Sequence, residues 1–444
     1  MLPNIILIVA DSLRYDHVGP QTGGTSLTPN LDAVAKQGIV FSQAIAQGPS
    51  TRVSMSALLS STYASLHGGE QRLSVERPVV QQMLKEAGYT TAGITSNLYL
   101  SGSFGWQRGF DHYDDCRPEA VYRRKLGLRI ANQVTKRLGQ PLVWPRALPA
   151  NLVFENAEMF WKNINRHFFM WVHLMDTHWP YSIQKFSWSP EWRRQRRQDV
   201  SIRPRLVADQ PQLSQSEITE LIDQYKYSVR YTDGHIGAFL RRLEAAGLRE
   251  NSWIFITADH GEEFLEHGRF FHHPTPYEEL VHVPLIVLPP RSFSSRQFKT
   301  YPGQVRLIDL VPTFLELAKA SPPPGTRLFG ASLVPIFHGQ NPTEERLAIT
   351  ESPHNQYLAV RSDCWKYIWN VKDDQRMLFN LNQDEGEKDN LVTREVGRAD
   401  TLHSILEDHL AMTQQAGSKN GRQDEEFVVD RDVMERLRGL GYVD

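Results

Sequence analysis

The chain has 444 residues, a formal net charge of −2 and 40% hydrophobic residues. This composition is ordinary for a globular protein, and the length predicts one large domain with a smaller one beside it. The charge balance argues against a dedicated nucleic-acid-binding protein, because such proteins carry a basic excess. The two cysteines, Cys116 and Cys364, exclude a disulfide framework or a thiolate metal cluster and suit a reducing compartment.

The N-terminal run MLPNIILIVADSL predicts a buried strand that ends in a polar turn. It does not fit a signal peptide, because it lacks a basic leading segment and a small-residue cleavage site, and Asp11 interrupts it. No later stretch of the sequence is long and apolar enough to span a bilayer. The sequence therefore predicts a cytoplasmic protein without a membrane span.

Strand-like and helical patterns alternate through the first three quarters of the chain. Strands are expected at residues 5–10, 90–97, 167–176, 252–259 and 283–290, and helices at 27–38, 79–88 and 217–247. Such alternation predicts an α/β fold with a doubly wound, mostly parallel sheet flanked by helices.

The pattern changes near residue 340. Short strand-like pieces follow at residues 347–352, 357–362, 366–371 and 376–381, and a helix is expected at 401–412. We therefore expect a main α/β domain over residues 1–340 and a C-terminal antiparallel subdomain with a terminal helix over residues 341–444.

Basic residues gather in two stretches, YRRKLGLRIANQVTKRLGQ at 122–140 and WRRQRRQD at 192–199. Such a stretch can be a solvated helix face or a positively charged rim that attracts an anionic substrate. The sequence leaves both interpretations open.

Three expected strands end in side chains capable of chemistry: ADSLRYD, VHLMDTHWPY and TADHGEEFLEHG. Sites in doubly wound sheets form at the carboxyl ends of strands. Asp11, Asp259 and His260 together offer two carboxylates and one imidazole, a set that suits one divalent cation. A mixed shell of oxygen and nitrogen favours manganese or zinc over calcium, which prefers oxygen alone.

Segments in matching order resemble the sulfatase branch of the alkaline phosphatase superfamily almost from end to end. They are NIILIVADSLRYDHVG, AQGPSTRVSMSALLSSTYASLHG, HLMDTHWPY, ITADHGEEFLEHGRFFHHPTPYEELVHVPLIV, LIDLVPTFLELA, LFNLNQDEGEKDNLV and LRGLGYVD. The resemblance implies that family's fold and a metal-dependent reaction on an anionic ester.

Residue by residue, the resemblance implies the metal ligands Asp11, Thr51, Asp259 and His260. It puts His178 and His272 beside the transferred group or the leaving oxygen, where an imidazole can donate a proton.

The resemblance suggests weaker roles for other side chains. Asn97 would bind a nonbridging oxygen or simply form a turn, and Arg52 would help bind the anion or be an exposed side chain. The neighbouring His173, His267 and His273 are expected to be structural or to lie behind the site.

The family's sulfatases carry Cys-x-Pro-Ser-Arg, whose cysteine, sometimes serine, is oxidised to formylglycine. The run SALLSSTYASLHG aligns Thr51 with that position, with Ser50 as the second choice. Residues 52–55 read RVSM, so the motif lacks its cysteine, its proline and its final arginine. The methyl group of threonine rules out the same aldehyde, whereas a metal-bound hydroxyl can attack phosphorus.

Thr51 is also expected to be the N-cap of a helix whose buried stripe is Met55, Leu58, Leu59 and Thr62. Free backbone amides and the helix dipole would then face the anionic oxygens of the substrate.

Together these features predict a metal-dependent hydrolase or transferase that acts on phosphate or phosphonate mono- or diesters through a covalent Thr51 intermediate. The alternatives are a sulfuric ester hydrolase and a catalytically silent binding protein with the same fold. Ser12 follows Asp11 where sulfatases often have a second aspartate, so one cation is expected, manganese or zinc before calcium. The expected partner is a small-molecule or glycan-linked anionic ester; its identity and the oligomeric state are left open.

Overall fold

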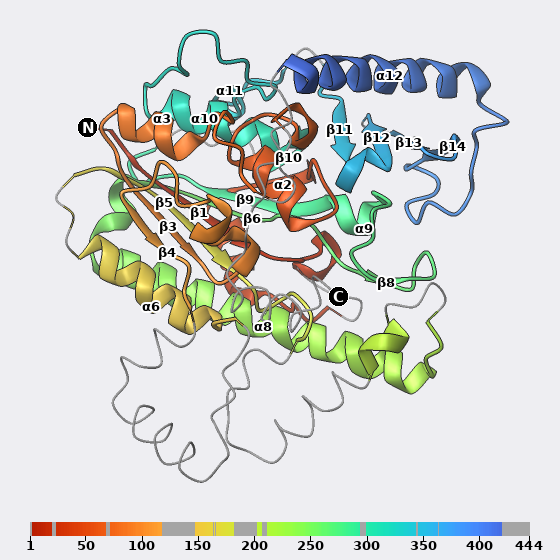
Figure 1. The fold of residues 1–444 in the computed structure, drawn as a ribbon. Coiled ribbons are helices and arrows are strands. Elements are labelled where there is room, and N and C mark those ends of the chain that lie inside the picture. Colours follow the sequence, from red (N-terminus) through yellow and green to blue (C-terminus); the bar gives the residue numbers. More distant parts are fainter. Residues whose placement is uncertain are drawn as a thin grey trace, which may run out of the picture.

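The computed structural model describes residues 2–19, 24–67, 72–117, 147–162, 164, 166–181, 202–206, 211–293, 299–342, 345–362 and 364–419. Its centre is an eight-stranded sheet with helices on both faces (Figure 1). The strand order is β10-β2-β9-β6-β1-β5-β3-β4, and only β9 runs antiparallel to its neighbours in this sheet. The predicted α/β class with a mostly parallel sheet is therefore confirmed.

Five strands of the sheet lie where the sequence predicts them: β1 (Asn4–Ala10), β3 (Thr90–Thr95), β5 (Phe168–Leu174), β6 (Ser252–Ala258) and β9 (His282–Leu288). Three others were not predicted: β2 (Ile39–Ile45), β4 (His112–Asp114) and β10 (Thr300–Arg306). These strands are short or partly exposed and carry polar residues, so they lack the continuous apolar run of a central parallel strand.

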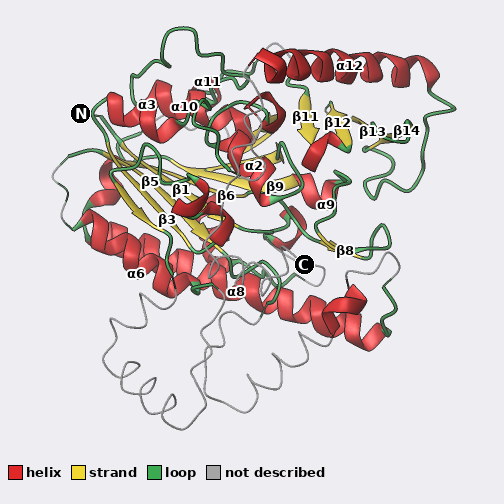
Figure 2. Ribbon diagram, viewed as in Figure 1, coloured by secondary structure: helices red, strands yellow, loops and turns green. Residues whose placement is uncertain are grey.

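Helices cover the sheet on its two faces, as Figure 2 shows. One face carries α1 (Pro29–Ala35), α6 (Ala150–Trp161) and the C-terminal half of α8 (Gln215–Ala245), and the other carries α2 (Thr51–Leu58), α3 (Val80–Glu86), α10 (Leu310–Leu317) and α11 (Val334–Phe337). Side chains of β1 alternate between them: Leu7 packs into the core under α2, and Ile8 into the core under α6. Both faces of the sheet are thus buried.

A second sheet follows in the chain, with the antiparallel order β11-β12-β13-β14. Its strands are β11 (Ala348–Glu351), β12 (Tyr357–Arg361), β13 (Trp365–Asn370) and β14 (Gln375–Asn380), and α12 (Val396–Lys419) packs on it through Leu402 and Leu406. This confirms the predicted antiparallel sheet and terminal helix, whereas the domain boundary near residue 340 stays a prediction.

The second sheet docks on the chain just before α2. The Glu351 amide donates to the Gln47 carbonyl (3.0 Å), and Thr350 Oγ1 donates to the Ala46 carbonyl (2.9 Å). The segment that leads to Thr51 is therefore held by both sheets.

The basic stretches 122–140 and 192–199 and the terminal LRGLGYVD lie outside the described residues. Within the described part of the chain, no helix is long and apolar enough to cross a membrane.

Candidate active site

Acidic and imidazole side chains meet where the central strands end. Asp11 follows β1 and Asp259 follows β6, and the last residues of these strands, Ala10 and Ala258, are in register. Ala10 is also in register with Leu174, the last residue of β5. Both aspartates are fully buried, so the parallel strands bring two carboxylates together inside the protein.

Neighbouring polar groups orient the two carboxylates. Asp11 Oδ2 accepts hydrogen bonds from Asn97 Nδ2 (2.8 Å) and Thr51 Oγ1 (3.3 Å). Asp259 Oδ1 accepts from the backbone amides of Ser12 (3.2 Å) and His260 (2.9 Å). Asp259 Oδ2 has no hydrogen-bond partner among the described residues, although it is buried.

His260 presents one ring nitrogen to these carboxylates. Its Nδ1 lies 2.8 Å from the Gly261 carbonyl, and since a carbonyl only accepts, Nδ1 carries a proton and Nε2 is the nitrogen that can offer a lone pair to a metal. Nε2 lies 3.6 Å from Asp11 Oδ1 and 3.7 Å from Asp259 Oδ2. Asp11, Asp259 and His260 therefore form a group that could hold a metal ion.

The carboxyl of Asp259 is held in its ionised form. Burial favours the neutral form of Asp259, but His260 and His173 outweigh burial and hold the pKa of this carboxyl below its usual range. An ionised Asp259 with an unpaired oxygen fits a bound cation. The residues present therefore suit a divalent metal.

The helix α2 brings Thr51 to the same place. Its Oγ1 lies 3.2 Å from His260 Nε2 and donates to Asp11, and the side chain is almost fully buried. The N-cap, however, is Ser50, whose backbone is extended (φ −150°, ψ 152°), and the helix already begins at Thr51. The prediction that Thr51 is the N-cap is therefore wrong by one residue, because the chain turns helical one peptide earlier.

A second hydrogen bond anchors α2 to the candidate metal group. Ser54 Oγ donates to the Asp259 carbonyl at 2.6 Å, which ties α2 to the end of β6. The residues of the predicted stripe, Met55, Leu58, Leu59 and Thr62, are all at most 1% exposed. The helix, however, ends at Leu58 and is buried on nearly all sides, so the prediction of one buried stripe that includes Thr62 is wrong.

Two further imidazoles lie next to His260. The ring of His272 lies 4.6 Å from that of His260 and 5.2 Å from that of His178, measured between centroids. His178 Nδ1 donates to the Trp179 carbonyl, and burial lowers the pKa of His178. Both histidines thus flank the candidate metal group, although their chemical roles stay predictions.

Glu262 sets the charge of His272 and was not singled out from the sequence. It is fully buried, with Oε1 3.4 Å from His272 Nδ1, and its Oε2 accepts from the Tyr181 hydroxyl (3.2 Å). Burial opposes a charged His272, but Glu262 and the two aspartates outweigh burial and raise the pKa of His272. The available signal was its position two residues after His260 in a matched segment.

Asn97 and Arg52 interact with one neighbour, Tyr99. Asn97 Oδ1 accepts from the Tyr99 amide (2.9 Å), so this side chain forms a turn and reaches Asp11 as well. The Arg52 guanidinium lies 4.3 Å from the centre of the Tyr99 ring. Their predicted contacts with substrate stay predictions.

His173 and Ser12 are further residues of the site whose place the sequence did not reveal. His173 was expected to be structural or behind the site, and its Nε2 lies 3.7 Å from Asp259 Oδ2 and 3.8 Å from Asp11 Oδ2. Ser12 has a left-handed backbone (φ 60°), and its Oγ donates to Asp11 Oδ1 (3.1 Å). The pairing of β1 with β5 brings His173 to the carboxylates, and the left-handed backbone of Ser12 accompanies its contact with Asp11.

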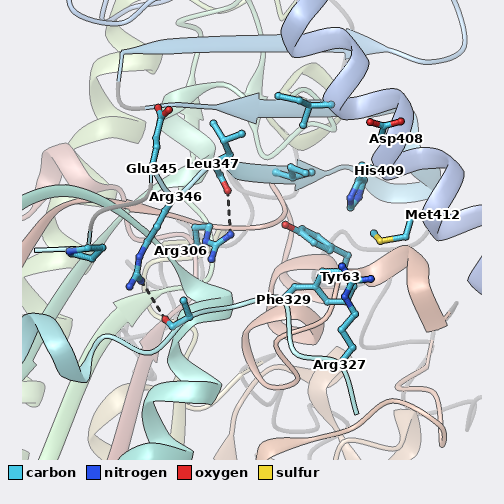
Figure 3. Close-up of a pocket in the computed structure, with 14 residues that line it drawn as sticks. Tyr63, Arg306, Arg327, Phe329, Glu345, Arg346, Leu347, Asp408, His409 and Met412 are labelled. Carbon is cyan, nitrogen blue, oxygen red and sulfur yellow. Dashed lines mark hydrogen bonds between the residues drawn. The ribbon is translucent and has the colours of Figure 1, made fainter. Parts of the chain in front are cut away.

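A separate pocket of about 650 Å³ lies between α12, β11 and the segment 327–331 (Figure 3). Its Arg306 and Arg346 both pair with the buried carboxylate of Asp309, at 2.8 and 2.9 Å. None of the candidate site residues lines this pocket. Its buried charges are paired with each other, unlike those at the strand ends.

Comparison with known proteins identifies the class. The family model described as Sulfatase matches residues 3–320, and that of the C-terminal part of N-sulphoglucosamine sulphohydrolase matches residues 265–416. The first match covers more than half of the chain. The chain therefore belongs to the sulfatase family, within the alkaline phosphatase superfamily, and so to a family of ester hydrolases.

Individual proteins give the same result. The chain is 24% identical to an arylsulfatase of Clostridium perfringens, over 91% of this chain and 94% of the relative. A solved structure in complex with its substrate D-glucosamine-2-N,6-O-disulfate has a TM-score of 0.68 at 18% identity, over 95% of this chain and 100% of that one. The phosphonate monoester hydrolase of Agrobacterium radiobacter also has a TM-score of 0.68 at 18% identity, over 93% and 96%. At such identities the structures indicate the fold alone.

The comparisons correct the expected function. The sequence interpretation favoured phosphate or phosphonate esters because Thr51 cannot become formylglycine, but both family models and the curated relative are sulfatases. The preference for phosphorus is therefore wrong, and the alternative of a sulfuric ester hydrolase is the better supported. One altered residue outweighed the whole-chain resemblance in that inference, although substrate choice depends on the entire site.

Proposed function

We propose that this protein hydrolyses a sulfate ester carried by a small molecule or a sugar. The observation that carries the proposal is the position of Thr51 Oγ1, 3.3 Å from Asp11 Oδ2 and 3.2 Å from His260 Nε2, in a chain of the sulfatase family. The arylsulfatase relative and the related fold with a bound disulfated sugar support this substrate class.

In this proposal Asp11, Thr51, Asp259 and His260 hold one divalent cation, zinc or manganese. The Oδ2 atom of Asp259, which has no hydrogen-bond partner among the described residues, and the orientation of His260 Nε2 toward the carboxylates support this donor set. The bound cation would lower the pKa of the Thr51 hydroxyl and offset the charge of the sulfuryl oxygens.

In this proposal Thr51 is the nucleophile and His272 is the proton donor. Thr51 Oγ1, having released its proton to solvent, forms a bond to sulfur while the bond from sulfur to the alcohol oxygen breaks. His272, with His178 beside it, gives the departing oxygen a proton. Water then attacks sulfur, which releases sulfate and restores the hydroxyl.

Two groups would bind the anion without taking part in bond changes. The free amides at the start of α2 and the helix dipole favour a negative group beside Thr51. Arg52 and Asn97 both contact Tyr99, and they would contact the remaining sulfuryl oxygens.

The test compares an aryl sulfate and an aryl phosphate as substrates of the metal-loaded protein. We expect higher kcat/KM for the sulfate, and Thr51→Ala to abolish turnover even at metal concentrations high enough to load the three remaining ligands. Ser50→Ala, one residue away, is the matched control and should leave more than about a tenth of the activity. Strong preference for the phosphate, or activity that survives Thr51→Ala and is lost in Ser50→Ala, would refute the proposal.

A further inference from the structure

His173 is a fully buried imidazole beside the candidate metal group. It lies near the end of β5, is 0% exposed, and neither ring nitrogen has a hydrogen-bond partner among the described residues. A buried polar group left unsatisfied costs free energy, and most such groups in folded proteins are paired. Its charged neighbours are the carboxylates of Asp259 and Asp11, which lie beyond hydrogen-bond distance and leave room for an ion between them and the ring.

The sheet aims this imidazole at the candidate metal group. His173 is one residue before the end of β5 and is in register with Val9, one residue before the end of β1, and with Thr95, the last residue of β3. Its neighbour two residues earlier, Trp171, packs in the core under α2, and alternation along a strand puts His173 on this same face. That face also carries Thr51.

The separations suit a shared cation better than a direct bond. His173 Nε2 lies 3.7 Å from Asp259 Oδ2, which also has no hydrogen-bond partner among the described residues, and 3.8 Å from Asp11 Oδ2. Both distances exceed that of a hydrogen bond. Two ligands about 2.1 Å from one ion, at a tetrahedral angle, lie about 3.4 Å apart, and His260 lies at similar separations from the same carboxylates.

Building on the metal site of the proposed function, we propose that His173 Nε2 is a further ligand of that cation. It supplies a nitrogen in a chain that has Ser12 where the family pattern has a second aspartate. Asp11, Asp259 and His260 are the residues whose ligand atoms lie together, and His173 would add a second nitrogen to their two carboxylates and one imidazole. Such a shell binds zinc or manganese and disfavours calcium, which takes oxygen ligands.

X-ray absorption of the zinc-loaded wild-type protein counts the imidazoles directly. We expect two at the metal in the wild type and one in His173→Gln, which keeps the volume but removes the ring. Zinc affinity should fall at least about 100-fold in this variant, while calcium affinity changes less than about 10-fold. His167→Gln, at the opposite end of β5, is the matched control and should leave the zinc site unchanged.

A single imidazole in the wild type, no zinc binding, or wild-type zinc affinity in His173→Gln would overturn the inference. If His173→Gln does not fold, the imidazole count of the wild type decides alone. Two imidazoles in a zinc-loaded protein that turns over no aryl sulfate would instead refute the proposed function and leave the role of His173 intact.

Discussion

A hydrogen bond from Ser54 to the Asp259 carbonyl links α2 to the candidate metal group. Removing this bond and measuring the free energy of unfolding tests the link. Ser54 Oγ and this carbonyl are 2.6 Å apart and fully buried, and they join α2 to a strand end 205 residues later. Ser54→Ala removes a hydrogen bond worth about 1 kcal/mol and leaves a buried carbonyl unpaired, at about 1–3 kcal/mol. We therefore expect the free energy of unfolding to fall by about 2–4 kcal/mol.

Ser56→Ala is the matched control on the same helix. Ser56 is also buried, but its Oγ donates at 2.9 Å to the Val53 carbonyl, within the helix itself. We expect it to lower the free energy of unfolding by less than about 1.5 kcal/mol. Urea unfolding of both variants measures the difference, and zinc titration should give weaker binding for Ser54→Ala alone. Equal losses of stability in the two variants would refute the anchoring role of Ser54.

Two further predictions concern buried charges. Asp309 is fully buried between two arginines, so Asp309→Asn should lower the free energy of unfolding by about 3–5 kcal/mol; a loss below 1 kcal/mol in urea unfolding would contradict this. Burial would raise the pKa of Glu351, but His409 and Ser65 outweigh it and lower this pKa. The carboxylate thus stabilises the fold above its unfolded pKa of about 4.3, and this stability is lost as the pH falls through the lower folded value. The deficit of Glu351→Gln relative to wild type should therefore shrink from pH 7 to acid pH, and a deficit independent of pH would contradict the reasoning.

Inferences that rest on many matched segments of this sequence were more reliable than one that rests on a single residue. Matched segments spread along the chain predicted the family correctly, because many independent positions agree. The choice of phosphorus over sulfur rested on one position, Thr51, and failed. A hydroxyl in place of the usual nucleophile changes how the site reacts, but the anion it binds depends on everything that surrounds the metal.

The sequence by itself determined the elements whose burial is complete. The apolar run of β1, the periodic stretch of α8 and the strand before Asp259 are readable because every side chain, or one whole stripe, is withdrawn from water. Since parallel strands end at one edge, the sequence also brought Asp11, Asp259 and His260 together.

Only the tertiary structure decided the rest. The strands β2 and β10 are partly exposed, so their pattern is set by neighbours distant in sequence. The contacts of His173 and Glu262 depend in the same way on strand register and on a loop that folds back. Which residue starts α2, Ser50 or Thr51, was settled by the backbone angle of one peptide. The local sequence does not predict such contacts, because they form only when segments distant in sequence pack together.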